Sequence, residues 1–237
     1  MSIDFQRARE ETLQYHKAYY SRFKLFEKDS WLENPDQPLM RLLDYLDGQI
    51  KILDLGCGVG RNAIPMAQAL QESKKNATIT CVDVLAESID LLKEYATTYK
   101  VEEIIDPVLS DNDQFVIEPN TYDLIAGIST LEHCQGKNKV AQLMAAIAKG
   151  TKSGGFVRIE MTTNRRVIDT TTNLPVPTFV ETPLDGEEVQ EMLQAKDTFA
   201  GWNIISLTID PYEEELAKED RTVHWCSTQI NFTAQKP

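Results

Sequence analysis

The chain has 237 residues, of which 42% are hydrophobic and 26% charged, a balance typical of soluble globular proteins. Its formal net charge of -13 argues against broad binding to nucleic acids or anionic membranes, because phosphate contacts need clustered Lys and Arg. No run of 18 apolar residues occurs, and the polar N-terminus lacks the apolar core of a signal peptide. We therefore expect neither a nucleic-acid partner nor a membrane.

The first 48 residues predict helices broken by prolines. Residues 4–28 are charged and aromatic with helical spacing, and Pro35 and Pro38 interrupt that pattern. A short helix follows over 39–46, and Gly48 ends it.

Strand and helix patterns then alternate along the chain. Apolar strand patterns occupy 50–55, 77–84, 105–109, 122–128 and, after a turn at 152–155, 156–161. Amphipathic helix patterns occupy 62–71, 87–99 and 139–149. Strands separated by helices of about 10–15 residues predict a parallel sheet with right-handed crossovers.

The character of the sequence changes after residue 162. Residues 163–183 are rich in Thr, Pro and Asn and predict a long loop. Asp185 and Glu188 form a capping box at the start of a further helix. Two strands, 202–209 and 223–234, joined by an acidic connection, complete the predicted fold.

A glycine-rich turn follows the first strand, within the stretch 52–62. Three glycines alternate with other residues there: Gly56, Gly58 and Gly60. Glycine lets the backbone adopt positive φ and approach a ligand closely, so this strand-to-helix turn predicts a small-molecule site. A dinucleotide-binding fingerprint would need a third glycine at position 61, where the chain has Arg61, and Asp54 stands two residues before the first glycine.

Polar side chains follow the next strands in the same register. Asp83 comes at the end of the second strand, Asp111 and Asn112 follow the third, and Ser129 follows the fourth. In open parallel sheets ligands bind beyond the carboxyl ends of the strands, so these residues are expected to surround one ligand. A carboxylate at the position of Asp83 suits the two hydroxyls of a ribose.

Together these motifs resemble the class I methyltransferases that use S-adenosylmethionine, over roughly residues 50–162. The resemblance implies a Rossmann-like, doubly wound α/β fold: seven mostly parallel strands, helices on both faces and an antiparallel final strand. It also implies S-adenosyl-L-methionine as cofactor, with the adenine near Asp111 and Asn112. The cofactor-binding residues implied in this way are Asp54, Gly56, Cys57, Gly58, Gly60, Arg61, Asn62, Asp83, Val84, Asp111, Asn112, Ile128 and Ser129.

The resemblance further implies one methyltransferase domain over 1–237. Its parts would be an N-terminal helical lid (1–48), a cofactor-binding core (49–162) and a substrate-side insertion with the final strands (163–237). These flanking parts are where such families keep their acceptor pockets.

His133 is the candidate general base, because it follows the fourth strand and imidazole titrates near neutrality; a packing role is the alternative. Side chains that can line an acceptor pocket are Tyr19, Trp31, Arg165 and His224, with Arg166 and Phe179 nearby in the sequence. The four cysteines are scattered, without metal-site spacing: Cys57, Cys81, Cys134 and Cys226. We expect reduced thiols, a cytoplasmic location and no metal site.

The sequence thus predicts an S-adenosylmethionine-dependent methyltransferase that acts on a small molecule as a monomer or homodimer. A protein methyltransferase and a non-catalytic cofactor-binding module remain alternatives. A nucleic-acid methyltransferase is disfavoured, because no Asn/Asp-Pro-Pro-Tyr motif follows the fourth strand. A nicotinamide-dependent oxidoreductase is disfavoured by Arg61.

Overall fold

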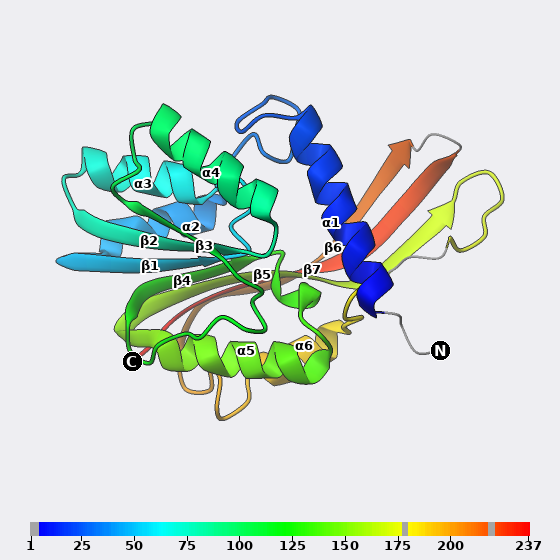
Figure 1. Ribbon diagram of the computed structural model, residues 1–237. Helices are drawn as coiled ribbons and strands as arrows, with labels where there is room; N and C mark the ends of the chain where they lie inside the picture. The colour runs from blue at the N-terminus through cyan, green and yellow to red at the C-terminus, as the bar shows by residue number, and fades with distance from the viewer. Residues whose placement is uncertain (1–4, 177–179, 218–220) are drawn as a thin grey trace.

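A computed structural model describes residues 5–176, 180–217 and 221–237, and its strands form one seven-stranded sheet in the order β3-β2-β1-β4-β5-β7-β6 (Figure 1). The strands are β1 (Gln49–Leu55), β2 (Asn76–Asp83), β3 (Ile105–Leu109), β4 (Tyr122–Ile128), β5 (Thr151–Asp169), β6 (Asn203–Ala217) and β7 (Thr222–Gln235). Strands β1 to β5 pair in parallel, whereas β7 runs antiparallel to both β5 and β6. The predicted doubly wound sheet with an antiparallel final strand is confirmed.

Helices cover both faces of this sheet (Figure 1). They are α1 (Phe5–Arg22), α2 (Gln37–Leu42), α3 (Ala63–Glu72), α4 (Ala86–Thr98), α5 (Lys137–Gly150) and α6 (Gly186–Leu193), with 3₁₀ turns at Leu43–Tyr45 and Leu131–His133. The capping box expected at α6 is present. The Asp185 side chain accepts the backbone N–H of Glu188, and the Glu188 side chain accepts the backbone N–H of Asp185.

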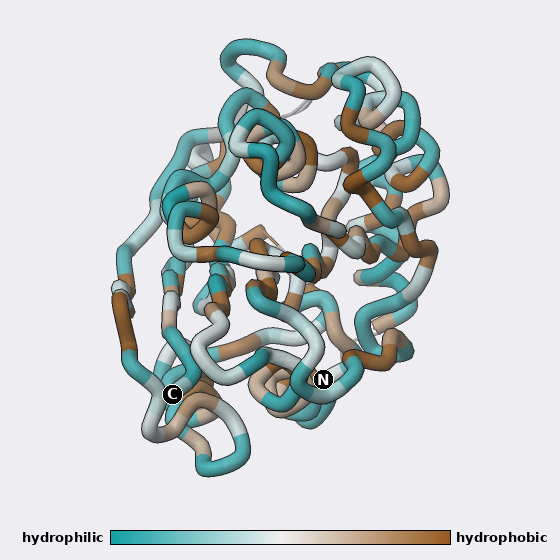
Figure 2. Tube along the Cα trace, turned by 90° about the vertical axis from the view of Figure 1, so that its left-hand side faces the viewer, coloured by the Kyte–Doolittle hydropathy of each residue, from teal (hydrophilic) through white to brown (hydrophobic). Residues whose placement is uncertain are grey.

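Strand β1 shows how the sequence builds two apolar layers. Ile50 and Ile52 pack with residues of α3 and α4, while Leu53 and Leu55 pack with residues of α5 and α6. All four are fully buried, and full burial of such a side chain stabilises the fold by about 1.5–3 kcal/mol. Hydrophobic and hydrophilic residues alternate along the surrounding helices, as expected for helices with one face on the sheet (Figure 2).

Strand β5 is much longer than predicted. It already pairs with β4 at Thr151, so the predicted turn at 152–155 is an irregular start of the strand. It continues to Asp169, opposite Val223 of β7, so the prediction of a loop is wrong for 163–169. Thr- and Asn-rich composition favours a loop locally, but the backbone hydrogen bonds supplied by β7 override that preference.

The acidic connection predicted before the last strand is also part of the sheet. Strand β6 extends to Ala217, and Glu213 pairs opposite Cys226 of β7. Glu213–Glu215 are exposed on this edge strand, so their charges stay in water and do not oppose the pairing. The far ends of β5, β6 and β7 project beyond α1 (Figure 1).

The segment after α1 is fixed to the sheet by a buried ion pair. Arg158 of β5 binds Asp36 through two hydrogen bonds, Nε to Oδ1 at 3.0 Å and Nη2 to Oδ2 at 2.7 Å. Asp36 also caps α2, and its own N–H donates to the Asn62 side chain at 2.9 Å. With side chains only 3% and 8% exposed, the pair holds this N-terminal segment against the sheet.

Candidate functional site

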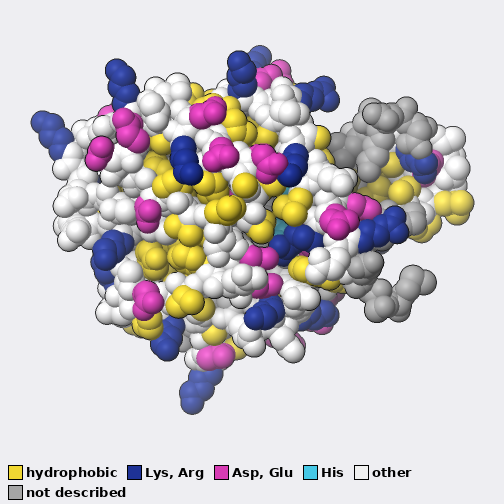
Figure 3. Space-filling model, in the orientation of Figure 1, with side chains coloured by type: hydrophobic (Ala, Val, Ile, Leu, Met, Phe, Trp, Pro, Cys, Tyr) yellow, Lys and Arg dark blue, Asp and Glu magenta, His cyan; other side chains and the backbone are white. Residues whose placement is uncertain are grey.

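A cavity of about 330 Å³ lies at the carboxyl ends of β1, β2 and β4, beneath α1. The strand order reverses there between β1 and β4, which is where open α/β sheets bind ligands. Side chains of both charges gather around a hollow beside α1, and a histidine is visible in it (Figure 3). The volume falls in the range of small-molecule sites.

The glycine turn forms the floor of this cavity, and its glycines are required by close neighbours. Gly56 and Gly58 have φ of +64° and +53°. A Cβ on Gly56 would lie 2.1 Å from Thr130 Oγ1, and one on Gly58 would lie 2.7 Å from the Tyr20 hydroxyl. Both positions need glycine for backbone conformation and for space, so the floor carries no side chain at these two positions.

Asp83 ends β2 at the edge of this floor. Its Oδ2 accepts the N–H of Gly58 at 2.9 Å and its Oδ1 accepts the N–H of Leu85 at 2.8 Å. Burial raises the pKa of Asp83, and the two backbone amides oppose that rise. Each oxygen keeps a lone pair for a further donor, and the residue lines the cavity.

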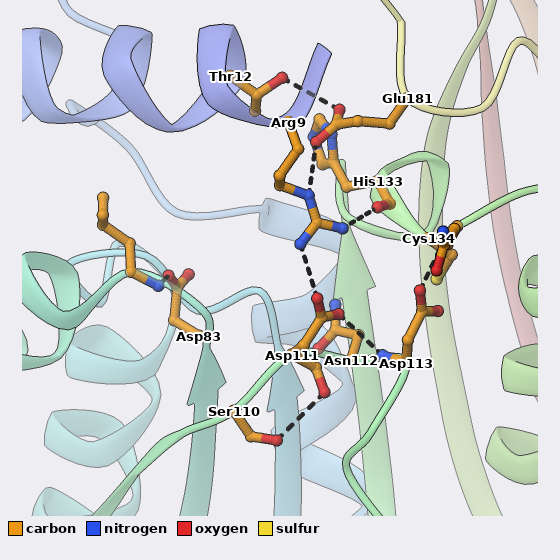
Figure 4. Close-up of polar contacts among 12 residues, drawn as sticks. Arg9, Thr12, Asp83, Ser110, Asp111, Asn112, Asp113, His133, Cys134 and Glu181 are labelled. Carbon is orange, nitrogen blue, oxygen red and sulfur yellow. Dashed lines mark hydrogen bonds and ion pairs between the residues drawn. The ribbon is translucent and has the colours of Figure 1, made fainter. Parts of the chain in front are cut away.

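Asp111 and Asn112 close the cavity beyond β3 (Figure 4). Asn112 Nδ2 donates to Thr130 Oγ1 at 2.8 Å, while Asn112 Oδ1 is buried without a hydrogen-bond partner. An unpaired buried acceptor beside a cavity fits a ligand that brings a donor, such as an amino group. Asp111 Oδ2 accepts a 2.7 Å hydrogen bond from Arg9 of α1.

The other predicted cofactor residues fall into two groups. On the cavity wall are Cys57, Arg61, Asn62, Val84, Ile128 and Ser129. Asp54 and Gly60 are not among the lining residues; a Cβ on Gly60 would lie 2.6 Å from Leu92 Cδ1, so Gly60 packs on α4. Asp54 is buried in β1, where burial raises its pKa to about 7 and one carboxylate oxygen has no partner.

His133 and Glu181 form a hydrogen-bonded pair on the opposite wall. His133 Nδ1 lies 2.5 Å from Glu181 Oε2, and the carboxylate comes from the connection between β5 and α6. Burial lowers the pKa of His133, but the hydrogen bond and charge of Glu181 outweigh it, so the pKa is raised. Burial likewise raises the pKa of Glu181, but His133, Arg9 and Thr12 outweigh it, and the pKa is lowered.

Arg9 of α1 joins the two walls (Figure 4). Its Nε donates to Glu181 Oε1 at 3.0 Å, its Nη1 donates to Asp111 and its Nη2 donates to the His133 carbonyl. The five donors of guanidinium suit such a three-way contact. Sequence reasoning missed Arg9 and Glu181, which are 172 positions apart.

A signal for α1 did exist in the sequence. The residues that α1 turns toward the cavity recur at helical spacing: Arg9, Thr12, Leu13, His16 and Tyr20. Burial, together with the charge of His133, lowers the pKa of His16 to about 4. For Glu181 no comparable signal exists, because it lies in an irregular connection.

Of the predicted acceptor residues, only Trp31 lines the cavity. Tyr19 stacks on the outer side of Trp31, with ring centroids 5.0 Å apart. Arg165 packs over the Trp225 ring at 4.5 Å, and His224 lies farther along β7, 3.4 Å from Glu213. Neither of these two lines the cavity, although the charge of Arg165 acts on His133 and Glu181 in its wall. Phe179 lies outside the described residues.

Two further properties concern the whole described chain. All four cysteines are buried free thiols. Among the described residues, every helix is too short or too polar to cross a membrane.

The chain is similar to known methyltransferases. A family model described as a methyltransferase domain matches residues 52–155. The ubiquinone biosynthesis O-methyltransferase of Neisseria meningitidis is 28% identical over 48% of this chain and 47% of its own length. The chain thus spans about half the length of the curated relatives it matches.

Solved structures agree with the fold. TehB from Haemophilus influenzae has a TM-score of 0.63 at 17% identity, covering 94% of this chain and 67% of TehB. The [4+2]-cyclase SpnF has a TM-score of 0.57 at 19% identity, covering 89% of this chain and 84% of SpnF. At these identities the likeness concerns the fold.

The fold and the site define a Rossmann-like methyltransferase architecture. The matching family model, the curated relatives and the solved structures all indicate the class I S-adenosylmethionine-dependent methyltransferases, and one solved neighbour, a geranyl diphosphate methyltransferase, is in complex with S-adenosylmethionine.

Proposed function

We propose that the protein transfers a methyl group from S-adenosylmethionine to a small molecule, with His133 as the proton acceptor. One observation carries this proposal. The imidazole of His133, held by Glu181, lines the same cavity as the glycine turn and Asp83. A nucleophile placed between them would face both the cofactor site and a base.

The residues present fit this cofactor. The N–H groups of the glycine turn and the start of α3 suit its carboxylate, Asp83 suits the ribose hydroxyls, and the unpaired Oδ1 of Asn112 suits the adenine amino group. When bound, the cofactor supplies an electrophilic methyl group. The protein's own part is then to align the acceptor and exclude water beneath α1.

His133 is oriented for proton transfer. Glu181 holds Nδ1, which leaves Nε2 as the ring nitrogen available to an acceptor. Because only neutral imidazole accepts a proton and Glu181 raises the pKa of His133, turnover should fall as the pH drops through the neutral range. A hydroxyl acceptor is supported by the O-methyltransferase relative, since a hydroxyl must lose its proton.

Two alternatives are separable by experiment. A protein methyltransferase would need a groove open to a peptide, whereas this cavity lies beneath α1. A non-catalytic binding module remains a rival, because the fold is shared with the cyclase SpnF and so does not by itself establish methyl transfer. We further propose that residues 1–48 form the lid, 49–162 the cofactor core and 163–237 the acceptor side of one domain. The buried free thiols support a cytoplasmic location.

The test combines binding with an acceptor screen. Calorimetry should show S-adenosylhomocysteine binding, and a screen of phenols, catechols and amines should reveal release of S-adenosylhomocysteine from S-adenosylmethionine. His133→Ala should keep cofactor affinity while turnover falls roughly 10²–10⁴-fold. Equal turnover in His133→Ala would eliminate the base, and cofactor binding without turnover on any acceptor, proteins included, would favour the binding module.

A further inference from the structure

The far end of the β6–β7 hairpin brings three metal-ligating side chains together. Glu213 of β6 pairs directly opposite Cys226 of β7, and His224 lies two residues before Cys226 on the same face of the strand. His224 Nε2 lies 3.4 Å from Glu213 Oε2 and 3.8 Å from Cys226 Sγ. One ligand atom from each residue lies within 4.8 Å of the other two.

We propose that Glu213, His224 and Cys226 form a Zn²⁺ site. Zinc in proteins is bound tetrahedrally at about 2.0–2.2 Å from nitrogen and oxygen and about 2.3 Å from sulfur. In a tetrahedron with those bonds, neighbouring ligand atoms are roughly 3.3–3.7 Å apart. The two separations from His224, 3.4 Å and 3.8 Å, are close to these values, and Glu213 and Cys226 lie within 4.8 Å of each other, so a small side-chain adjustment brings all three onto one ion.

The donor set selects the metal. Thiolate, imidazole and carboxylate together suit a borderline-soft ion such as Zn²⁺, whereas Mg²⁺ and Ca²⁺ prefer oxygen alone. Three protein ligands leave a fourth position for water, and the exposure of His224 and Glu213 (side chains 37% and 64%) gives an ion access from solvent.

The neighbouring charges do not oppose this site. At the next register positions, Arg166 of β5 lies opposite Cys226 and Glu215 of β6 lies opposite His224. These two neighbours carry opposite charges, so the three ligands are not flanked by cations alone. The site is separate from the cofactor cavity, because none of its three ligands lines that cavity.

Zinc bound here would tie β6 to β7 near the end of the hairpin. Zinc that binds the folded protein and not the unfolded chain stabilises the folded protein by mass action. The melting temperature should therefore rise with zinc concentration. The expected effect is to stabilise the sheet extension beside Arg165 and Trp225.

The test uses the full-length protein, freed of metal with a chelator, and zinc alone. Calorimetry should show one equivalent of Zn²⁺, and Co²⁺ should give the intense visible bands of a tetrahedral site with a near-ultraviolet band from thiolate coordination. Cys226→Ser should abolish the near-ultraviolet band. Cys226→Ser, His224→Ala and Glu213→Gln should each weaken zinc at least tenfold, by analogy with the loss of a supporting ligand contact.

Matched variants make the result decisive. Glu215→Gln changes the carboxylate opposite His224 and should bind zinc like the wild type. His133→Ala should also bind zinc like the wild type, because His133 lines the cofactor cavity and is not one of the three proposed ligands. Circular dichroism checks that each variant is folded. Zinc affinity in a Cys226→Ser, His224→Ala double variant equal to that of the wild type would overturn the proposal, as would a wild type that binds no zinc.

Discussion

The cofactor side and the acceptor side of the cavity are built in different ways. On the cofactor side, Asp83 and the glycine turn follow adjacent strands, and their contact spans 25 positions of the sequence. On the acceptor side, Arg9 and Glu181 meet across 172 positions and belong to elements outside the central parallel strands. The first arrangement follows from strand order alone, whereas the second depends on how α1 and the connection after β5 pack.

This difference predicts that the two sides respond differently to substitution. Changes on the cofactor side should alter cofactor affinity first, whereas changes on the acceptor side should alter turnover and its pH dependence. Three of the four experiments below test that separation, and the fourth tests the burial of His16 on α1.

Among these four experiments, the largest effect is expected at Asp83. Asp83→Ala removes the acceptor of two backbone N–H groups and of the proposed ribose contact, so S-adenosylhomocysteine affinity should fall by about 3 kcal/mol, roughly 100-fold. Calorimetry measures the change. Asp90→Ala, on the exposed face of α4, is the control and should bind like the wild type. Unchanged affinity in Asp83→Ala would remove this residue from the cofactor site.

Glu181→Gln should lower turnover by roughly 10–100-fold at neutral pH while leaving cofactor affinity near wild type. Glutamine keeps a hydrogen bond to His133 but removes the charge that raises its pKa, so burial should dominate and the acid limb of the rate profile should move to lower pH. Rate profiles against pH for this variant and for the exposed Glu187→Gln measure the shift. An acid limb that stays in place would show that another group titrates.

Arg9→Met should lower turnover about tenfold, because it breaks the link between α1, Asp111 and Glu181, which is worth about 1–2 kcal/mol for a partly buried ion pair. Cofactor affinity should change less than turnover. The matched control is Arg22→Met, in the exposed last turn of the same helix. If Arg9→Met instead lost mainly cofactor affinity, α1 would belong to the cofactor side.

The smallest effect at neutral pH is expected from His16→Gln. The pKa of His16 is about 4 in the folded protein against 6.5 unfolded, so the unfolded state takes up a proton first as the pH falls. The free energy of unfolding should therefore decline between pH 6.5 and 4, by up to about 3 kcal/mol from this residue, and then level off. Urea unfolding against pH should show a flatter decline in His16→Gln. Identical slopes would show that this imidazole is not held neutral.

The central strands and the capping box of α6 were predictable because each depends on a local pattern. Alternating apolar residues in β1 determine which of them face each helix layer, and Asp185 caps α6 through contacts three residues apart. The extension of β5 to Asp169 was not predictable in this way, because its hydrogen-bond partners lie on β7, more than 50 positions away.

The sequence by itself therefore determined the strands of the cofactor half and which side chains stand at their ends, since a parallel sheet places those ends at one edge whatever the flanking segments do. Only the tertiary structure decided which groups meet His133 and that Glu213, His224 and Cys226 share one face of a hairpin. These side-chain contacts depend on long-range packing and strand register. Short stretches of sequence carry no periodic signal for either.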